Sequence, residues 1–199
     1  MVKADPRHLR FRLIKAGLAL IERSGAAGLS LRAVARRAGV SHMAPYSHFR
    51  NRMDLLSALA TAGFADFDAR IDQAAAAGAP SPREQMRLTG LAYIRFSMER
   101  PRLLALMFGG LIPPKEQSVE LRSARGRAFA LIVNVVRAGQ QQGMFKPADP
   151  AVAAVAAWSL VHGYSQLALG KEMLAKLGVR EAGLLTTAQD VIRRLLDGL

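Results

Sequence analysis

Residues that begin or end α-helices divide this sequence into about nine segments, and none of them alternates polar and apolar side chains over the length of a strand. Alanine, a strong helix former, occurs 35 times, against 23 for Val, Ile and Thr together. The pattern therefore predicts an all-α fold. The expected helices cover about 7–23, 31–38, 42–47, 52–77, 82–100, 102–108, 118–142, 150–170 and 183–197.

Positive charge is concentrated near the N-terminus. Residues 1–52 carry 11 Lys and Arg and 2 acidic side chains, a net charge of +9, whereas residues 53–199 carry 17 and 13, a net charge of +4. A basic segment on a nearly balanced body is typical of a polyanion-binding head. We therefore expect two domains, 1–52 and 53–199. A soluble protein that is merely basic throughout is the alternative.

Several classes of function find little support. The chain has no cysteine, which excludes disulfides, thiolate catalysis and cysteine-bound zinc. The histidines at 8, 42, 48 and 162 form no metal-binding pair, the carboxylates are dispersed, and no glycine-rich phosphate loop is present. We expect no enzyme, no cofactor and no metal site.

Residues 150–170 contain no Lys, Arg, Asp or Glu. The length of this uncharged segment approaches the length of a helix that spans a bilayer. The segment is rich in alanine and contains Ser159, His162 and Gln166, so we expect a helix buried in protein, as at the core of a dimer, and no membrane. Near the N-terminus, charged residues leave the apolar run too short for a secretory signal. We therefore expect a cytoplasmic protein.

Two short helices are predicted to meet at Gly39-Val40-Ser41. Ser30 and Ser41 are favourable N-caps for the two helices, Gly39 can adopt the positive φ of a tight turn, and Val40 offers an apolar plug. Two short capped helices joined by a tight turn, with arginines on both sides, are typical of a helix-turn-helix motif. The second helix of such a motif enters a major groove of DNA. Any helical hairpin is the alternative, because such turns occur widely, although the spacing favours a DNA-binding motif.

The turn, followed by Tyr46-Ser47-His48-Phe49 and a cation at position 52, resembles the DNA-binding head of the TetR family of transcriptional regulators. The resemblance covers about residues 10–60. One departure is that Arg52 stands where the family usually has lysine, and arginine presents a planar fork where lysine presents a point charge.

The resemblance implies a role for each matching residue. Base contacts are expected from the start of the recognition helix, phosphate contacts from Tyr46 and His48, and a phosphate or guanine contact from Arg32. Arg52 is expected to add to an anion site at a helix N-terminus, and Phe49 to fill the core of the head. For His42 and for His48, the alternative is a solvated side chain that makes no contact with DNA. The expected DNA-binding residues are Arg32, Ser41, His42, Met43, Ala44, Tyr46, His48 and Arg52.

Residues 53–199 are implied to bind an effector and to dimerise. Trp158, followed four residues later by His162-Gly163, resembles the TetR C-terminal domain named for a Trp-His-Gly signature. Trp158 and His162 lie on one helix face. The helices near 150–169 and 183–197 together suit one half of a symmetric four-helix interface, so we expect a homodimer.

Aromatic and methionine side chains of the body are candidates for an effector pocket, although such stripes more often form ordinary core. No charged residue stands out as a ligand anchor, so a small, largely apolar effector is expected. The candidates are Tyr93, Phe96, Met107, Phe108, Phe129, Trp158 and His162.

The sequence thus favours a sequence-specific DNA-binding transcriptional regulator, a repressor released from a palindromic operator by a ligand. Two alternatives remain at this point. A non-specific, basic architectural DNA-binding protein shares the positive head, and a helical interaction module would use the apolar segment 150–170.

Overall fold

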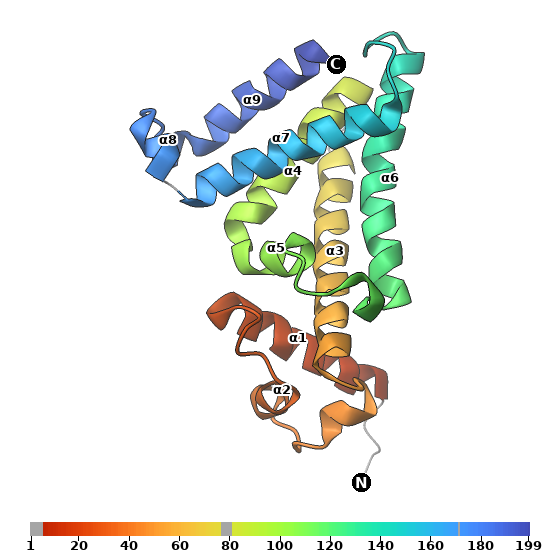
Figure 1. Cartoon of the computed structure of the whole chain (residues 1–199), viewed down its shortest axis with the longest axis vertical. Helices are drawn as coiled ribbons and strands as arrows, with labels where there is room; N and C mark the ends of the chain where they lie inside the picture. Colours follow the sequence, from red (N-terminus) through yellow and green to blue (C-terminus); the bar gives the residue numbers. More distant parts are fainter. Residues whose placement is uncertain (1–5, 77–80, 171) are drawn as a thin grey trace. The chain divides into compact units, whose positions relative to one another are not determined.

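The computed structural model describes residues 6–76, 81–170 and 172–199 (Figure 1). Within these ranges the chain is helical, and no strand is present in them. The chain divides into two compact units. The N-terminal unit comprises Met1–Ala65 and Arg100–Arg125, and the C-terminal unit comprises Asp66–Glu99 and Gly126–Leu199.

The N-terminal unit is built around a core of aliphatic and aromatic side chains that includes Leu13, Ile21, Val34, Phe49 and Leu55, each at most 1% exposed. It contains α1 (Pro6–Ser24), α2 (Leu31–Ala38), the 3-10 helix η1 (Ala44–Ser47), the first part of α3 (Arg52–Ala76), α5 (Pro101–Phe108), the 3-10 helix η2 (Pro114–Glu116) and the beginning of α6 (Val119–Gln141).

Two arginines at the start of α5 join it to the end of α1. Arg102 donates to the carbonyls of Glu22 and Arg23, and the Arg100 guanidinium lies 3.0 Å from the Glu22 carboxylate. The last carbonyls of a helix have no partner within the helix. A guanidinium at that end therefore donates hydrogen bonds to these carbonyls. Its positive charge also interacts favourably with the negative pole of the helix dipole.

In the C-terminal unit, α4 (Pro82–Glu99) packs against both α7 (Pro150–Gly170) and α9 (Leu184–Gly198) (Figure 1). Gly90 lies at this crossing, where an added Cβ would come within 3.1 Å of Ile192 and 3.4 Å of Val161. The remaining elements are the later part of α3, most of α6, the short α8 (Glu172–Lys176) and the 3-10 helix η3 (Glu181–Gly183).

The all-α prediction is confirmed, with two local differences. The segment expected as a helix over 42–47 is a 3-10 turn at Ala44–Ser47, and the short α8 was not expected. Residue 77, expected at the end of α3, lies outside the described ranges. The expected functional boundary after residue 52 stays a prediction.

Among the described helices, α7 is long and apolar enough to cross a bilayer, as judged by length and composition alone. A core helix of a soluble protein passes the same test. The side chains of α7 that pack inside the C-terminal unit include Ala153, Ala157, Val161 and Tyr164.

Two glycines of α6 have opposite surroundings. At Gly139 an added Cβ would lie 2.1 Å from the buried ring of Phe145, whose own backbone N–H donates to the Gly139 carbonyl. At Gly126 nothing lies within 4 Å of an added Cβ. Packing requires a glycine at 139. At 126 no contact requires one, and the glycine only destabilises the helix relative to alanine.

We therefore predict opposite signs for one substitution at two positions of the same helix. Gly139→Ala should lower the free energy of unfolding by about 1–3 kcal/mol, because the Phe145 ring is displaced. Gly126→Ala should raise it by up to about 1 kcal/mol. Urea denaturation followed by circular dichroism measures both, and equal effects of the two variants would contradict the packing role of Gly139.

Candidate functional site

The turn at 39–41 has the geometry that its sequence predicts. Ser30 caps α2, since its Oγ accepts a hydrogen bond from Ala33 N–H at 3.1 Å. Gly39 ends the helix with a φ of +65°, and the N–H groups of Gly39 and Val40 donate to the carbonyls of Arg36 and Ala35. These bonds close the C-terminus of α2 and reverse the chain.

The segment after the turn is tighter than expected. Instead of an α-helix capped by the Ser41 side chain, it forms η1, in which Ala44 N–H donates to the Ser41 carbonyl and Tyr46 N–H to the Met43 carbonyl. Pro45 explains the difference, because it has no N–H to donate and its ring is buried against the head. This segment, residues 42–47, is thus a short, stiff turn, and it is called the recognition segment below.

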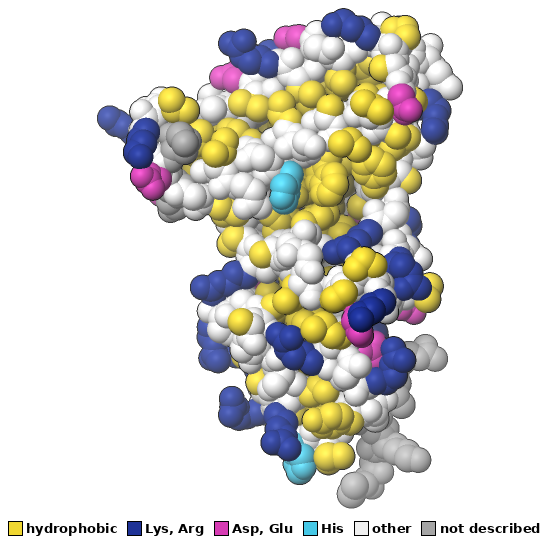
Figure 2. All heavy atoms as spheres, viewed as in Figure 1, with side chains coloured by type: hydrophobic (Ala, Val, Ile, Leu, Met, Phe, Trp, Pro, Cys, Tyr) yellow, Lys and Arg dark blue, Asp and Glu magenta, His cyan; other side chains and the backbone are white. Residues whose placement is uncertain are grey.

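Most of the predicted DNA-binding side chains are exposed. Met43 and Tyr46 are 59% and 45% exposed, although large side chains of this kind are more often buried. Arg32, Ser41 and His42 are also exposed, whereas Ala44, His48 and Arg52 are half-buried. Lys and Arg side chains gather over α1 and α2 in Figure 2.

Phe49 is 1% exposed and fills the core of the head, as expected. The guanidinium of Arg10 lies 5.7 Å above its ring. Asn51 caps α3, because its side-chain oxygen accepts from Asp54 N–H at 2.9 Å. The start of α3 is therefore fixed next to the recognition segment.

Arg52 is oriented differently from the exposed arginines of α2. Its guanidinium donates to the carbonyls of Leu29, Ala26 and Ala27, in the loop between α1 and α2. The sequence does not predict these bonds, because the partners lie 23 to 26 residues away. A contact of Arg52 with DNA stays a prediction.

Five of the predicted effector-pocket residues lie in the C-terminal unit. The Tyr93 hydroxyl is 2.7 Å from His162 Nδ1, and the rings of Trp158 and His162 are 6.1 Å apart. Phe129 stands edge-on to Trp158 at 6.5 Å. The cluster formed by Tyr93, Phe129, Trp158 and His162 is called the aromatic cluster below.

Phe67 of α3 was missed by the sequence reasoning, and it connects the predicted residues. Its ring lies 5.6 Å from Tyr93 and 5.6 Å from Phe96. The Phe96 ring is fully buried, and the guanidinium of Arg70 covers it at 5.4 Å. Phe96 is therefore enclosed core. The only signal for Phe67 was its place on the long apolar stripe of α3.

Met107 and Phe108 do not belong to the aromatic cluster. Both lie at the end of α5 in the N-terminal unit, where Phe108 contacts Phe64 edge-on at 5.4 Å. Met107 is fully buried, and its sulfur lies 2.7 Å from where a Cβ on Gly63 would be. A role for either residue in effector binding stays a prediction.

The one strongly perturbed group of the aromatic cluster is Tyr93. Burial raises the pKa of Tyr93 to about 12, although a hydrogen bond with Trp158 opposes the shift. The hydroxyl therefore keeps its proton at neutral pH and can donate it to Nδ1 of His162.

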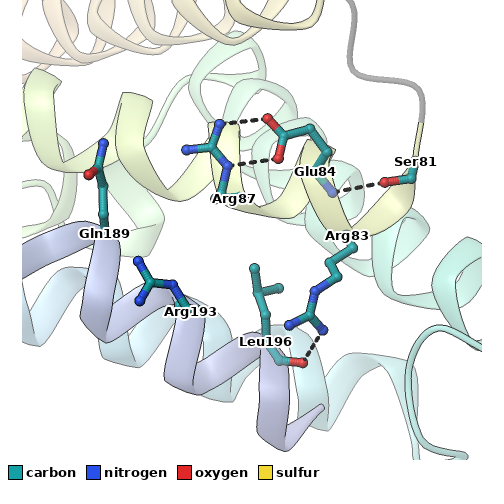
Figure 3. Close-up of a pocket in the computed structure, with 7 residues that line it drawn as sticks. All are labelled: Ser81, Arg83, Glu84, Arg87, Gln189, Arg193 and Leu196. Carbon is teal, nitrogen blue, oxygen red and sulfur yellow. Dashed lines mark hydrogen bonds and ion pairs between the residues drawn. The ribbon is translucent and has the colours of Figure 1, made fainter.

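A polar cavity of about 310 Å³ lies between α4 and α9 (Figure 3). Its three arginines are held by neighbouring groups of the protein: Arg87 by Glu84, Arg83 by Asp197 and the Leu196 carbonyl, and Arg193 by Asp190. Figure 3 shows the Arg87 guanidinium turned toward Glu84 and the Arg83 guanidinium turned toward the Leu196 carbonyl. In the described part of the chain, no group of three or more His, Asp or Glu side chains could hold a metal ion.

Two family models match this chain. One, described as bacterial regulatory proteins of the tetR family, matches residues 13–59, which contain the turn and the recognition segment. The other, described as a tetracyclin repressor-like C-terminal domain, matches residues 86–191, which contain Tyr93, Trp158 and His162. No curated protein matches the chain.

Solved structures share the fold over nearly the whole chain. A protein of unknown function from Rhodococcus sp. RHA1 is 34% identical, with a TM-score of 0.80 and 94% of each chain covered. The TetR-family regulator PfmR from Thermus thermophilus is 21% identical, with a TM-score of 0.67, covering 94% of this chain and 98% of its own. FadR from Bacillus subtilis, solved in complex with stearoyl-CoA, is 17% identical, with a TM-score of 0.72, covering 96% and 99%.

The C-terminal model covers more than half of the chain, and the N-terminal model covers the helix-turn-helix. Members of this family are DNA-binding transcriptional regulators that dimerise. The chain belongs to the TetR family of transcriptional regulators.

Proposed function

We propose that the protein is a cytoplasmic repressor that binds a palindromic operator as a homodimer and is released by a small, largely apolar ligand. The observation that carries the DNA-binding part is the exposed recognition segment. Met43 and Tyr46 stand in solvent beside His42, while Val34 and Phe49 fill the core beneath. An exposed apolar tip on a basic head suits contact with thymine methyl groups and phosphates.

Dimerisation is proposed through the outer face of α7. Val152 and Val155 are 65% and 48% exposed, and Ala156, Ser159 and Gly163 continue the exposed face along the helix. No Lys, Arg, Asp or Glu interrupts it from 150 to 170. Uncharged, small side chains permit the close approach of a second helix, and α9 (Leu184–Gly198) would complete a four-helix interface.

The effector is proposed to bind at the aromatic cluster. Trp158, His162 and Phe129 are half-buried, so they can gain contacts from a ligand, whereas Phe96 is already enclosed. The cluster offers aromatic surface and the Tyr93–His162 hydrogen bond, and it contains no Lys, Arg, Asp or Glu. FadR from Bacillus subtilis was solved with stearoyl-CoA, whose acyl chain is its apolar part, so fatty acids and other compounds with a long acyl chain are the first class to test.

The proposed coupling runs through α3. This helix begins at Arg52, beside the recognition segment, and Phe67 on its later part contacts Tyr93. A ligand that shifts Tyr93 changes the packing of α3. Release from DNA then requires only that the ligand bind better to a state whose two heads do not fit the operator.

Fluorescence anisotropy tests the regulator against the architectural alternative. Labelled DNA from upstream of the protein's own gene is compared with a coding fragment of equal length at about 150 mM salt, where non-specific contacts are weak. A preference of roughly a thousandfold or more supports sequence-specific regulation. If neither fragment is preferred and selection from random duplexes yields no preferred sequence, the protein is instead a non-specific architectural DNA-binding protein.

We predict that two Tyr→Phe variants separate the two activities. Tyr46→Phe removes one expected phosphate contact per head and should weaken DNA binding about tenfold to thirtyfold, since each hydrogen bond contributes about 1 kcal/mol. Tyr93→Phe should leave DNA affinity unchanged without ligand and weaken ligand binding.

Trp158 is the only tryptophan of the chain and makes the second effect measurable. Its fluorescence is titrated with stearoyl-CoA and a series of fatty acids, while anisotropy follows DNA binding. Each variant is the control for the other. Loss of DNA binding in Tyr93→Phe, or none in Tyr46→Phe, would contradict these assignments.

We further predict that Val155→Glu dissociates the dimer. A carboxylate on each side of the proposed interface would be buried without a partner, so the dissociation constant should rise at least about a hundredfold. Val119→Glu is the matched control, because this valine also lies near a helix N-terminus and is more exposed, 65% against 48%. Analytical ultracentrifugation measures both, and a dimer that tolerates Val155→Glu would place the interface elsewhere.

A further inference from the structure

The loop before α2 and the C-terminal end of α2 are each bound by an arginine from another helix. In the loop before α2, Arg52 of α3 donates Nε to the Leu29 carbonyl at 2.9 Å and Nη2 to the Ala26 carbonyl at 2.6 Å, with the Ala27 carbonyl at 3.4 Å. At the C-terminal end, Arg12 of α1 donates Nη2 to the Ala38 carbonyl at 2.6 Å. These two arginines are called the α2 clamp.

The carbonyls bound by the clamp need such donors. Ala38 is the last residue of α2, and the N–H groups of the following turn are already used by Ala35 and Arg36. The loop before α2 has few partners of its own, apart from the bond between Leu29 N–H and the Ala26 carbonyl. Without the arginines, the position of this eight-residue helix would depend mainly on its apolar face.

Arginine suits this task better than lysine. The planar guanidinium directs several N–H groups in fixed directions, so one side chain can hold three carbonyls at once, whereas an ammonium group is a single point of charge. The half-buried Arg52 side chain is thus already engaged along its donor edge. Arg32, in contrast, is exposed on the first turn of α2.

We propose that Arg12 and Arg52 are positioning residues, which fix α2 and the turn at 39–41 relative to α1 and α3 and so set the place of the recognition segment. They are not phosphate contacts, although both contribute to the basic charge of the head. The consequence for DNA binding rests on the proposed function, whereas the effect on α2 does not.

The salt dependence of DNA binding distinguishes a positioning residue from a phosphate contact. Each phosphate contact adds about 0.9 to the slope of log K against log salt, so loss of a contact lowers the slope and weakens binding to any duplex. Loss of a positioning residue misplaces the base-reading side chains. It lowers affinity for the operator while the slope and the affinity for unrelated DNA stay constant.

The experiment compares R52Q, R12Q and R52K with R32Q and the wild type, on operator and unrelated duplexes from about 50 to 300 mM salt. We expect R52Q and R12Q to lose operator affinity about tenfold or more with the wild-type slope. R52K should be intermediate, because lysine keeps a donor but cannot span three carbonyls. R32Q, the phosphate-contact control, should lose about one unit of slope per head and weaken binding to both duplexes.

Three results would overturn the proposal. A lower slope in R52Q or R12Q would show a phosphate contact. An unchanged ratio of operator to unrelated affinity, with only a lower unfolding midpoint, would show a purely stabilising role. Equal binding of R52K and the wild type would show that the three-carbonyl geometry is unimportant.

Amide hydrogen exchange tests the clamp independently of DNA. In R52Q, exchange should accelerate at residues 26–41 and remain as in the wild type in α5 and α6. Unchanged exchange at 26–41 would overturn the clamp. If the wild-type protein prefers no DNA sequence, the proposed function fails, and this measurement alone decides the clamp.

Discussion

The helix-turn-helix depends on donors for the carbonyl groups at its helix ends. A helix of eight residues, such as α2, leaves as many of its backbone groups without internal partners as it satisfies. Ser30 and the turn at Gly39 supply some of the missing bonds, and guanidiniums supply others: Arg12 for α2, Arg52 for the loop before it and Arg102 for the end of α1. The recognition segment is held by this framework.

The positive charge of the head therefore serves two purposes. Part of it neutralises the partial negative charge of carbonyl groups inside the protein, as Arg12 and Arg52 do. Another part, on exposed side chains such as Arg32, Arg36 and Arg37, faces solvent and is available to a polyanion. A net charge of +9 over residues 1–52 indicates the class of partner but overstates how many cations can reach it.

Local features were predictable from the sequence, because their causes lie within a few residues. The cap at Ser30 and the left-handed Gly39 were of this kind. The 3-10 form of η1 was not predicted, although its cause is equally local: Pro45 has no N–H for an α-helical hydrogen bond. The family resemblance added the expected roles of single residues, such as Arg32 and Tyr46, and not the helices themselves.

Features that depend on distant parts of the chain could not be read in this way. The partners of Arg52 lie across a loop, and Phe67 contacts Tyr93 only because α3 and α4 pack together. Residue type alone grouped Met107 with Trp158, although the chain places them in different units. A list of aromatic and methionine side chains cannot distinguish such groups.

The absence of Lys, Arg, Asp and Glu from α7 has a consequence for the order in which a complex with DNA comes apart. Salt weakens contacts to phosphates steeply, but it does not weaken an association of uncharged helix faces. On the proposed interface, a rise in ionic strength detaches the protein as an intact dimer. Rebinding is then a single encounter whose rate does not depend on prior reassembly of two subunits.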